Sequence, residues 1–323
     1  MVQRPVLLSL QYLRAIAATA VVVFHTEWSH TVLGAAGVDI FFVISGFVMA
    51  MVGDRAPSPR AFITARALRI VPLYWLVTVA QGVAGHESLR RTLLSIAFIP
   101  HLDPKDNAWP VVIPGWTLNY GVFFYVLVTG LLFAPYWIRL WALGLALLAL
   151  VVSGLVLHPV NVVAITYTNP ILLEFMAGIV LHRAWRRGWL RSDRIGVGLF
   201  GLGVVSLLAQ FTWPAPEAWR LLQWGLPASL IVAGSLGIEA GGRMPVWPWL
   251  SLAGSASYAV YLMHGTVLHH LQSPVRPLPA PVAVGMLVVA CLVVGVGVHF
   301  LIERPVTAAL RRLLTPARVA AVT

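Results

Sequence analysis

The chain is built mainly from long apolar segments that carry almost no charge. Hydrophobic residues make up 59% of its 323 residues and charged residues only 10%. A soluble domain has about 45–50% apolar and about 25% charged residues. A helix that crosses a bilayer needs about 20 largely apolar residues, and many stretches here meet that need. The sequence therefore predicts an all-α, polytopic transmembrane helical bundle.

About ten segments are predicted as membrane-spanning helices. They cover roughly residues 8–28, 34–53, 69–85, 116–135, 138–157, 165–182, 195–212, 220–239, 249–270 and 281–302. The stretch 92–100, TLLSIAFIP, is too short to span and is expected to be interfacial or re-entrant. We expect one integral-membrane domain over residues 1–323, with no C-terminal soluble domain and no internal repeat.

The basic residues predict the orientation of this bundle. The net charge is +11, and Lys105 is the one lysine beside 21 arginines. If the N-terminus is cytoplasmic, sixteen arginines fall on the cytoplasmic side and five basic residues on the outer side. The cytoplasmic set is Arg4, Arg55, Arg60, Arg66, Arg69, Arg139, Arg183, Arg186, Arg187, Arg191, Arg194, Arg243, Arg304, Arg311, Arg312 and Arg318, and the outer set is Arg90, Arg91, Lys105, Arg220 and Arg276. Positive charge concentrates in cytoplasmic loops, so both termini are predicted to be cytoplasmic, and no nucleic-acid partner is expected.

Two ionisable residues lie within the first apolar segment. In LRAIAATAVVVFH, Arg14 and His25 are separated by 11 residues, which is about three helical turns and about 16.5 Å along the axis. Both side chains therefore lie on one helix face. A charge at the centre of a bilayer helix costs about 2.5–3.5 kcal/mol on insertion scales, so such residues usually face a protein interior or an aqueous cavity. A packed, hydrogen-bonded histidine is the alternative to a catalytic one.

The second apolar segment adds a carboxylate at a similar depth. Asp39, in GVDIFFVISGF, follows the outer loop as His25 precedes it. A carboxylate beside an imidazole can fix its tautomer and stabilise the imidazolium. The alternative is that Asp39 only caps its helix. Ser45 and Gly46 fit close helix packing.

Six motifs, in order along nearly the whole chain, resemble those of the membrane-bound acyltransferase-3 family, in its exopolysaccharide and O-antigen acetyltransferase branch. They are LRAIAATAVVVFH (13–25), GVDIFFVISGF (37–47), RALRIVPLYWL (66–76), PGWTLNYGVFFY (114–125), NPILLEFMAG (169–178) and SYAVYLMHG (257–265). The resemblance implies a ten-helix domain in the bacterial inner (cytoplasmic) membrane. It also implies transfer of an acyl group, usually acetyl from acetyl-CoA, to a hydroxyl of a glycan or glycolipid, with acyl-CoA as donor and no permanently bound cofactor.

The resemblance also implies roles for particular residues. His25 matches the family's essential histidine, expected to act as general base with Asp39 or Glu174 as its supporting carboxylate. Arg14 matches the essential arginine. Arg66 and Arg69 match an R-x-x-R pair, and these three arginines are expected to bind acyl-CoA. Topology alone is the alternative for Arg66 and Arg69, and a structural ion pair is the alternative for Glu174.

The remaining motifs imply an acceptor site. Trp116, Asn119, Tyr258 and His264 are expected to bind the sugar, although Tyr258, Tyr261 and His264 also fit an interfacial aromatic belt. No spacing of histidines and acidic residues predicts a metal site.

One position departs from the family pattern. After WTLNY the family normally has glutamate, where this chain has Gly121. The change is compatible with an altered acceptor, with a substitute carboxylate such as Asp39 or Glu174, or with a catalytically impaired variant. A further alternative, from a different class, is a non-catalytic transporter or flippase of a lipid-linked sugar.

Overall fold

The computed structural model of the chain describes residues 7–29, 33–54, 58–211 and 219–314. Within these ranges it is helical, with no strand. The helices are α1 (Leu8–Phe24), α2 (Ala36–Gly53), α3 (Pro59–Ala84), α4 (Leu89–Ile96), α5 (Trp116–Leu131), α6 (Tyr136–Leu157), α7 (Val162–Tyr167), α8 (Leu172–Arg186), α9 (Asp193–Leu208), α10 (Leu226–Ala240), α11 (Pro248–Val275), α12 (Ala280–Val298) and α13 (Arg304–Leu314). Two π-helical turns, Leu221–Gly225 and His299–Glu303, lead into α10 and α13.

Each of the ten segments predicted to span the membrane overlaps at least one of these helices, and the segment 165–182 overlaps both α7 and α8. Among the described residues, six helical stretches are long and apolar enough to cross a membrane by themselves: Leu33–Gly53, Pro59–Ala84, Ile138–Leu157, Val162–Arg186, Leu221–Ala240 and Ala280–Leu314. Helix α1 is apolar but shorter, with 17 residues. The stretch 92–100 contains the end of the eight-residue helix α4. The chain is therefore a helical membrane protein, and its ten crossings remain a prediction.

The third helix begins ten residues earlier than the sequence predicted. The Ser58 hydroxyl accepts a hydrogen bond from the Ala61 amide, and Pro59 occupies the first turn. Serine at the cap and proline at the first helical position both favour a helix start. The prediction began at residue 69 because the preceding arginines break the apolar run. In the structure Arg66 and Arg69 lie on the flank of a continuous helix, where they can face the protein interior.

Close approach of backbones brings the central helices together. An ideal Cβ on Gly46 of α2 would lie 2.0 Å from the Phe175 carbonyl oxygen of α8, and one on Gly178 would lie 2.0 Å from the Val43 carbonyl oxygen. One on Gly254 of α11 would lie 2.1 Å from the Gln11 carbonyl oxygen of α1. Small residues at such crossings let membrane helices approach. The crossings fix α1 against α11 and α2 against α8.

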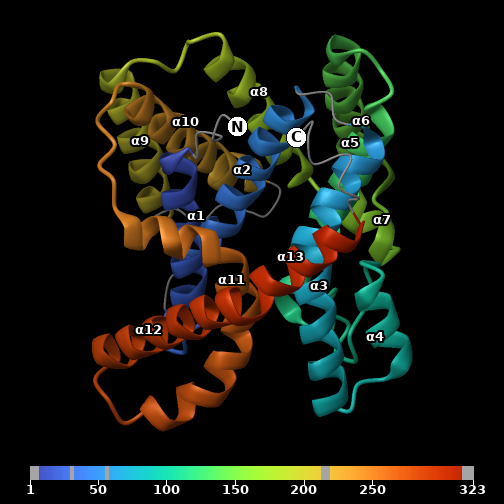
Figure 1. Cartoon of the computed structure of the whole chain (residues 1–323), viewed down its shortest axis with the longest axis vertical. Helices are drawn as coiled ribbons and strands as arrows, with labels where there is room; N and C mark the ends of the chain where they lie inside the picture. Colours follow the sequence, from blue (N-terminus) through green and yellow to red (C-terminus); the bar gives the residue numbers. More distant parts are fainter. Residues whose placement is uncertain (1–6, 30–32, 55–57, 212–218, 315–323) are drawn as a thin grey trace.

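Figure 1 shows how these pairs are arranged. Helices α1, α2, α8, α9 and α10 form one group in the upper left, and α5 and α6 stand beside α2 and α8 on the right. Helices α11 and α12 lie at the lower left, and α3 extends to the lower right with α4. Helix α13 crosses the middle of the view in front of α3.

Buried helix ends are satisfied by charged side chains from other helices. The Glu239 carboxylate of α10 accepts hydrogen bonds from the Leu8 amide at 2.8 Å, the Ser9 amide at 3.0 Å and the Ser9 hydroxyl. Arg139, only 7% exposed, donates to the Gly53 carbonyl of α2 at 2.9 Å and to the Ala134 carbonyl after α5 at 3.1 Å. A carboxylate at a helix N-terminus and a cation at helix C-termini complement the helix dipoles.

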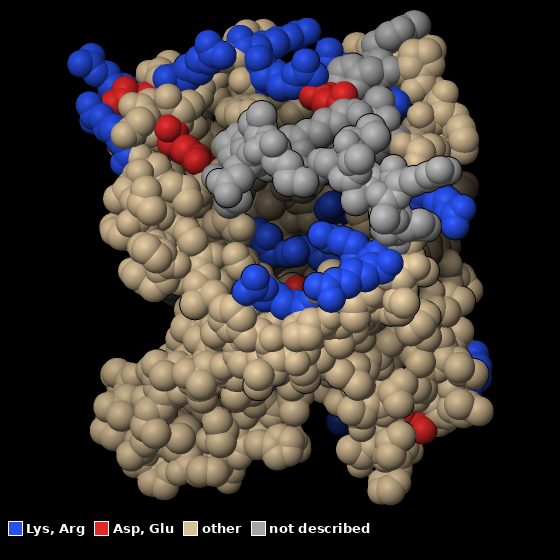
Figure 2. Space-filling model, viewed as in Figure 1, with Lys and Arg blue, Asp and Glu red and all other residues tan. Residues whose placement is uncertain are grey.

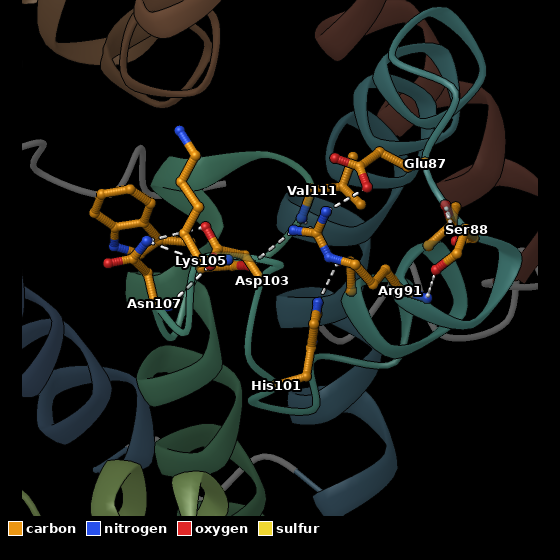
Figure 3. Close-up of polar contacts among 11 residues, drawn as sticks. Glu87, Ser88, Arg91, His101, Asp103, Lys105, Asn107 and Val111 are labelled. Atoms are coloured by element: carbon orange, nitrogen blue, oxygen red, sulfur yellow. Dashed lines mark hydrogen bonds and ion pairs between the residues drawn. The ribbon is translucent and has the colours of Figure 1, made fainter.

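The segment between α4 and α5 is ordered by its own polar contacts (Figure 3). The Asp103 carboxylate accepts hydrogen bonds from the amides of Lys105 and Asn107, each at 2.8 Å. Arg91 donates to the Glu87 carboxylate and, at 3.3 Å, to the Trp109 carbonyl. These contacts tie the connection back to α4.

We expect Glu239→Ala to destabilise the protein, because the substitution leaves the first amides of α1 without an acceptor. Hydrogen bonds to a charged group contribute about 1.5–3 kcal/mol. Thermal unfolding in detergent should therefore show a clearly lower midpoint temperature for this variant. Glu27→Ala is the matched control, since it removes a carboxylate from an exposed ion pair with Arg276, which is worth roughly 0–1 kcal/mol. Equal midpoints for the two variants would contradict the expectation.

Candidate active site

A cavity lies between α1, α2, α3, α5, α8 and α11. Its volume is about 160 Å³. Helix α2 supplies an apolar wall that includes Val38, Phe41, Phe42 and Val48, and Phe175 of α8 extends that wall. The opposite wall is polar, which is unusual for the interior of a membrane bundle. Groups of this kind inside a membrane protein mark a functional site.

Three arginines from two helices line this cavity. They are Arg14 of α1 and both Arg66 and Arg69 of α3. The Arg14 guanidinium donates a hydrogen bond from Nη2 to the Ser257 hydroxyl of α11 at 3.0 Å. The three residues that the sequence singled out as donor-binding thus share one cavity, although α2 and the α2–α3 connection separate them along the chain. The cavity is suited to an anionic ligand.

Tyrosine hydroxyls form another part of the polar wall. The Tyr258 hydroxyl donates to the Ile70 carbonyl at 2.7 Å. Thr117 donates to the Pro114 carbonyl at 2.9 Å, so its oxygen accepts the hydrogen bond from the Tyr261 hydroxyl, at 3.1 Å. Both tyrosines line the cavity. Because each hydroxyl already has a partner, the tyrosines are fixed in place.

A series of rings connects the cavity wall to His25. The His25 and His264 rings have centroids 4.8 Å apart, and those of His264 and Tyr261 are 5.6 Å apart. His264 is 2% exposed, whereas His25 is exposed at the C-terminal end of α1. The sequence predicted that Arg14 and His25 share one helix face, and both indeed contact α11. The cavity and His25 are therefore two parts of one continuous region.

The tautomer of His25 follows from its hydrogen bond. Its Nδ1 lies 2.9 Å from the Val21 carbonyl oxygen. A carbonyl only accepts hydrogen bonds, so neutral His25 carries its proton on Nδ1 and presents a lone pair on Nε2. His264 makes the same kind of bond, from Nδ1 to the Tyr261 carbonyl. In this arrangement Nε2 of His25 is the atom that can accept a proton.

The two candidate carboxylates lie together on the far side of α2 and α8. Asp39 and Glu174 are each 0% exposed. Asp39 accepts a hydrogen bond from Arg220 Nη2 at 2.9 Å, and the Asp39 and Glu174 carboxyl groups are close enough to interact electrostatically. Neither Glu174 oxygen has a hydrogen-bond partner among the described residues.

The carboxylates make their contacts with Arg220 and not with His25. No hydrogen bond or ion pair joins His25 to Asp39 or Glu174 in the described part of the chain, where the orienting partner of the imidazole is the Val21 carbonyl. Nor does Asp39 cap α2, because the helix has no side-chain cap. The sequence analysis had placed Arg220 among the outer topology charges and missed this contact. Its position at the outer start of a span, at the depth of Asp39, was the signal that could have found it.

Of the four predicted acceptor residues, one lies in the cavity wall. Tyr258 lines the cavity, and His264 is connected to it through Tyr261. The Trp116 ring instead packs against Phe42, with centroids 6.5 Å apart. Asn119 is 3% exposed, and its Oδ1 receives no hydrogen bond. Helix α5 reaches the cavity through Thr117 and Leu118, which the sequence analysis did not assign to the site, and through Gly121, where the family pattern has glutamate.

Gly121 leaves open space in the wall of the cavity. An ideal Cβ at this position would meet no atom within 4 Å. A larger side chain here would therefore extend into the cavity without displacing the backbone. Among the described residues no group of three or more His, Cys, Asp or Glu side chains is arranged to hold a metal ion.

The two glycine environments predict opposite responses to one added methyl group. Gly178→Ala places a Cβ against the Val43 carbonyl of α2, and overpacking of this kind costs about 1–3 kcal/mol. Gly121→Ala adds the same atom to open space, so its stability should match that of the unchanged protein. Thermal unfolding of both variants in the same detergent checks this. If Gly121→Ala were the less stable of the two, the cavity would not extend to Gly121.

Comparison with known proteins adds an independent finding. The family model described as "Acyltransferase domain" (Acyl_transf_3) matches residues 7–303. The "Exopolysaccharide production protein ExoZ" of Rhizobium meliloti (strain 1021) is 37% identical over 290 residues, covering 85% of this chain and 90% of that protein. "Acyltransferase MdmB" of Streptomyces mycarofaciens is 26% identical over 278 residues, covering 74% and 70%.

A third relative covers a different share of its own chain. The "Putative peptidoglycan O-acetyltransferase YrhL" of Bacillus subtilis (strain 168) is 26% identical over 346 residues, covering 91% of this chain and 54% of that protein. No solved structure shows significant similarity to the chain.

Proposed function

Because the chain belongs to the acyltransferase family whose domain model spans nearly its whole length, it is an O-acyltransferase, and we propose that it moves an acetyl group from acetyl-CoA to a hydroxyl of a glycan or lipid-linked sugar. The observation that carries this proposal is the cavity that holds Arg14, Arg66 and Arg69 and is connected by rings to His25. We place the enzyme in the bacterial inner membrane as a multi-pass protein with both termini in the cytoplasm.

The three cavity arginines support acyl-CoA as the donor. CoA carries phosphate groups, and guanidinium groups bind phosphate through charge-assisted hydrogen bonds. CoA does not cross lipid, so its site must open to the cytoplasm, the side to which the charge distribution assigns Arg66 and Arg69. Arg14 lies in the same cavity and is held by Ser257. In this proposal Arg66 and Arg69 bind phosphate, and Arg14 binds the arm that carries the thioester.

We assign the sugar acceptor to the C-terminal end of α1, where His25 lies. A sugar hydroxyl attacks a thioester slowly until a base removes its proton. Nε2 of His25 has the free lone pair for this step, and histidine is the residue that most often serves as a general base. A lipid-linked sugar or growing polysaccharide reaches this side of the bundle. The printed name of the relative ExoZ, an exopolysaccharide production protein, supports a glycan as the acceptor class.

The reaction then balances as an acyl transfer. His25 takes the proton of the acceptor hydroxyl as its oxygen bonds to the thioester carbonyl carbon. The carbon–sulfur bond breaks, and CoA leaves as the thiol by taking the proton that His25 removed from the acceptor, which returns His25 to its neutral form. Arg14 lies about 16.5 Å from His25 along α1, so in this scheme it holds the thioester arm and does not contact the reacting carbonyl. Asp39, Glu174 and Arg220 act at a distance in this scheme, by fixing α2 and α8, which form the apolar wall.

We expect His25→Ala to abolish acetyl transfer to a glycan while acetyl-CoA binding is retained. Loss of a general base typically costs 10²–10⁴-fold in rate. The matched control is His270→Ala, which removes an exposed histidine of α11 whose Nδ1 also bonds its own helix, to the Thr266 carbonyl. The measurement is transfer of labelled acetyl to a glycan acceptor by protein in nanodiscs. Turnover that survives His25→Ala would refute the mechanism.

Gly121 supplies a second test of the same reaction. Gly121→Glu places the family's carboxylate in the open part of the cavity. If the unchanged protein transfers acetyl groups, the impaired-variant hypothesis is wrong. If only the Gly121→Glu variant transfers acetyl groups, the chain is an inactive form of the enzyme. The assignment of acetyl-CoA as donor and a glycan as acceptor then stands. If neither variant transfers acetyl but the protein moves lipid-linked sugar between leaflets, the proposed reaction is wrong.

A further inference from the structure

A short amphipathic helix crosses α3 beside the cavity. Helix α13 (Arg304–Leu314) continues from α12 through the π-helical turn His299–Glu303 and passes in front of α3 (Figure 1). The Thr307 hydroxyl donates a hydrogen bond to the Leu68 carbonyl at 3.2 Å. Leu68 lies between Arg66 and Arg69 in the sequence, so this contact fixes α13 at the level of the two cavity arginines.

The spacing of the α13 arginines places them around that contact. Positions 304, 307 and 311 share one helix face, because residues three and four apart are neighbours on a helix. Arg304 and Arg311 therefore lie on either side of Thr307, about 10.5 Å apart along the axis. Arg312 follows, and all three arginines are exposed. Glu303, which directly precedes them, is close enough to Arg14 to interact with it electrostatically.

The surface at this place is a hollow with a basic rim. Figure 2, viewed as Figure 1, shows basic side chains gathered around a hollow at the centre of the molecule, where Figure 1 draws α3 and α13. Arg60, Arg66 and Arg69 of α3 and the three arginines of α13 are the basic residues of these two helices. The positive charge thus continues from the cavity to the surface.

The α13 arginines lack the acidic partners that many other arginines have. Arg91, Arg186, Arg220, Arg243 and Arg276 each form an ion pair with an Asp or Glu. Among the residues that the structure describes, Arg311 and Arg312 have no ion pair, and Arg304 lies over the Phe300 ring, 5.2 Å from its centroid. Three adjacent cations without acidic partners, at the mouth of a cavity lined by three more, fit a ligand with several separated phosphate charges.

We propose that α13 binds the adenosine 3′,5′-bisphosphate end of the acyl donor, outside the cavity that receives the acylated arm. This inference rests on the proposed function for the identity of the donor. The 3′-phosphate and the 5′-pyrophosphate of CoA lie at the end opposite to the thioester. When the thioester arm enters the cavity beside Arg14, Arg66 and Arg69 contact the phosphate of the pyrophosphate that is nearest the arm. The adenosine 3′,5′-bisphosphate end then stays at the mouth, where α13 presents Arg304, Arg311 and Arg312.

The test compares donors that contain and lack the nucleotide. The variant is the triple substitution Arg304→Gln, Arg311→Gln and Arg312→Gln, and the control is Arg187→Gln, Arg191→Gln and Arg194→Gln, which removes three exposed arginines near the α8–α9 connection. We expect the KM for acetyl-CoA to rise about 10- to 100-fold in the α13 variant, because each arginine–phosphate contact is a charge-assisted hydrogen bond. The KM for S-acetylpantetheine and kcat should remain unchanged, and lysine at the three positions should restore part of the affinity for acetyl-CoA.

A binding measurement separates this inference from the proposed reaction. Adenosine 3′,5′-bisphosphate should bind the unchanged protein and the control, and bind the α13 variant at least about tenfold more weakly. That result supports the inference even if no acetyl transfer occurs, in which case the proposed reaction alone fails. Equal nucleotide binding by all three proteins overturns the inference, as does an equal rise in KM for S-acetylpantetheine. A KM difference that occurs only in nanodiscs containing anionic lipid would instead identify α13 as a lipid-headgroup site and would also overturn it.

Discussion

The cost of placing charge inside a bilayer determines much of this structure. Several deeply placed ionisable groups are paired or face a cavity. Asp39 is held by Arg220, Arg139 by backbone carbonyls, and Arg14 by Ser257 in a cavity wall. Because each arrangement joins different helices, the polar groups also fix how the apolar helices sit against one another. Lipid provides no hydrophobic force between helices, so such contacts and the glycine crossings must hold them.

The polar groups form two regions, one on each side of α2. On one side of α2 the Asp39 and Glu174 carboxyl groups are buried, and the ion pair of Asp39 with the partly exposed Arg220 joins α2 to the turn before α10. On the other side the cavity contains arginines, tyrosines and open space at Gly121. Helix α2 therefore separates the buried carboxyl groups from the arginine-lined cavity.

The sequence was sufficient to predict the helical membrane class and the family, because apolar length and ordered motifs are local properties. It also predicted that Arg14 and His25 share a face, since that follows from 3.6 residues per turn.

The sequence did not predict the partner of Asp39, because the contact with Arg220 spans 181 positions along the chain. The start of α3 was predicted too late, since hydropathy alone treats arginines as boundaries, whereas a helix flank can point them inward. Thr117 and Leu118 were missed as wall residues because motif resemblance draws attention to Trp116, Asn119 and Gly121 and says nothing about which face of α5 meets the cavity.

The parallel packing of α1 against α11 has a consequence for how this sequence can change. Arg14 meets Ser257 near one end of the contact, and His25 meets His264 near the other. Substitutions between these points alter side chains but preserve the pairing. A single inserted or deleted residue in that interval of α1 would rotate His25 by about 100° relative to Arg14 and move it off α11. The number of residues in this interval therefore determines whether Arg14 and His25 can meet α11 at the same time.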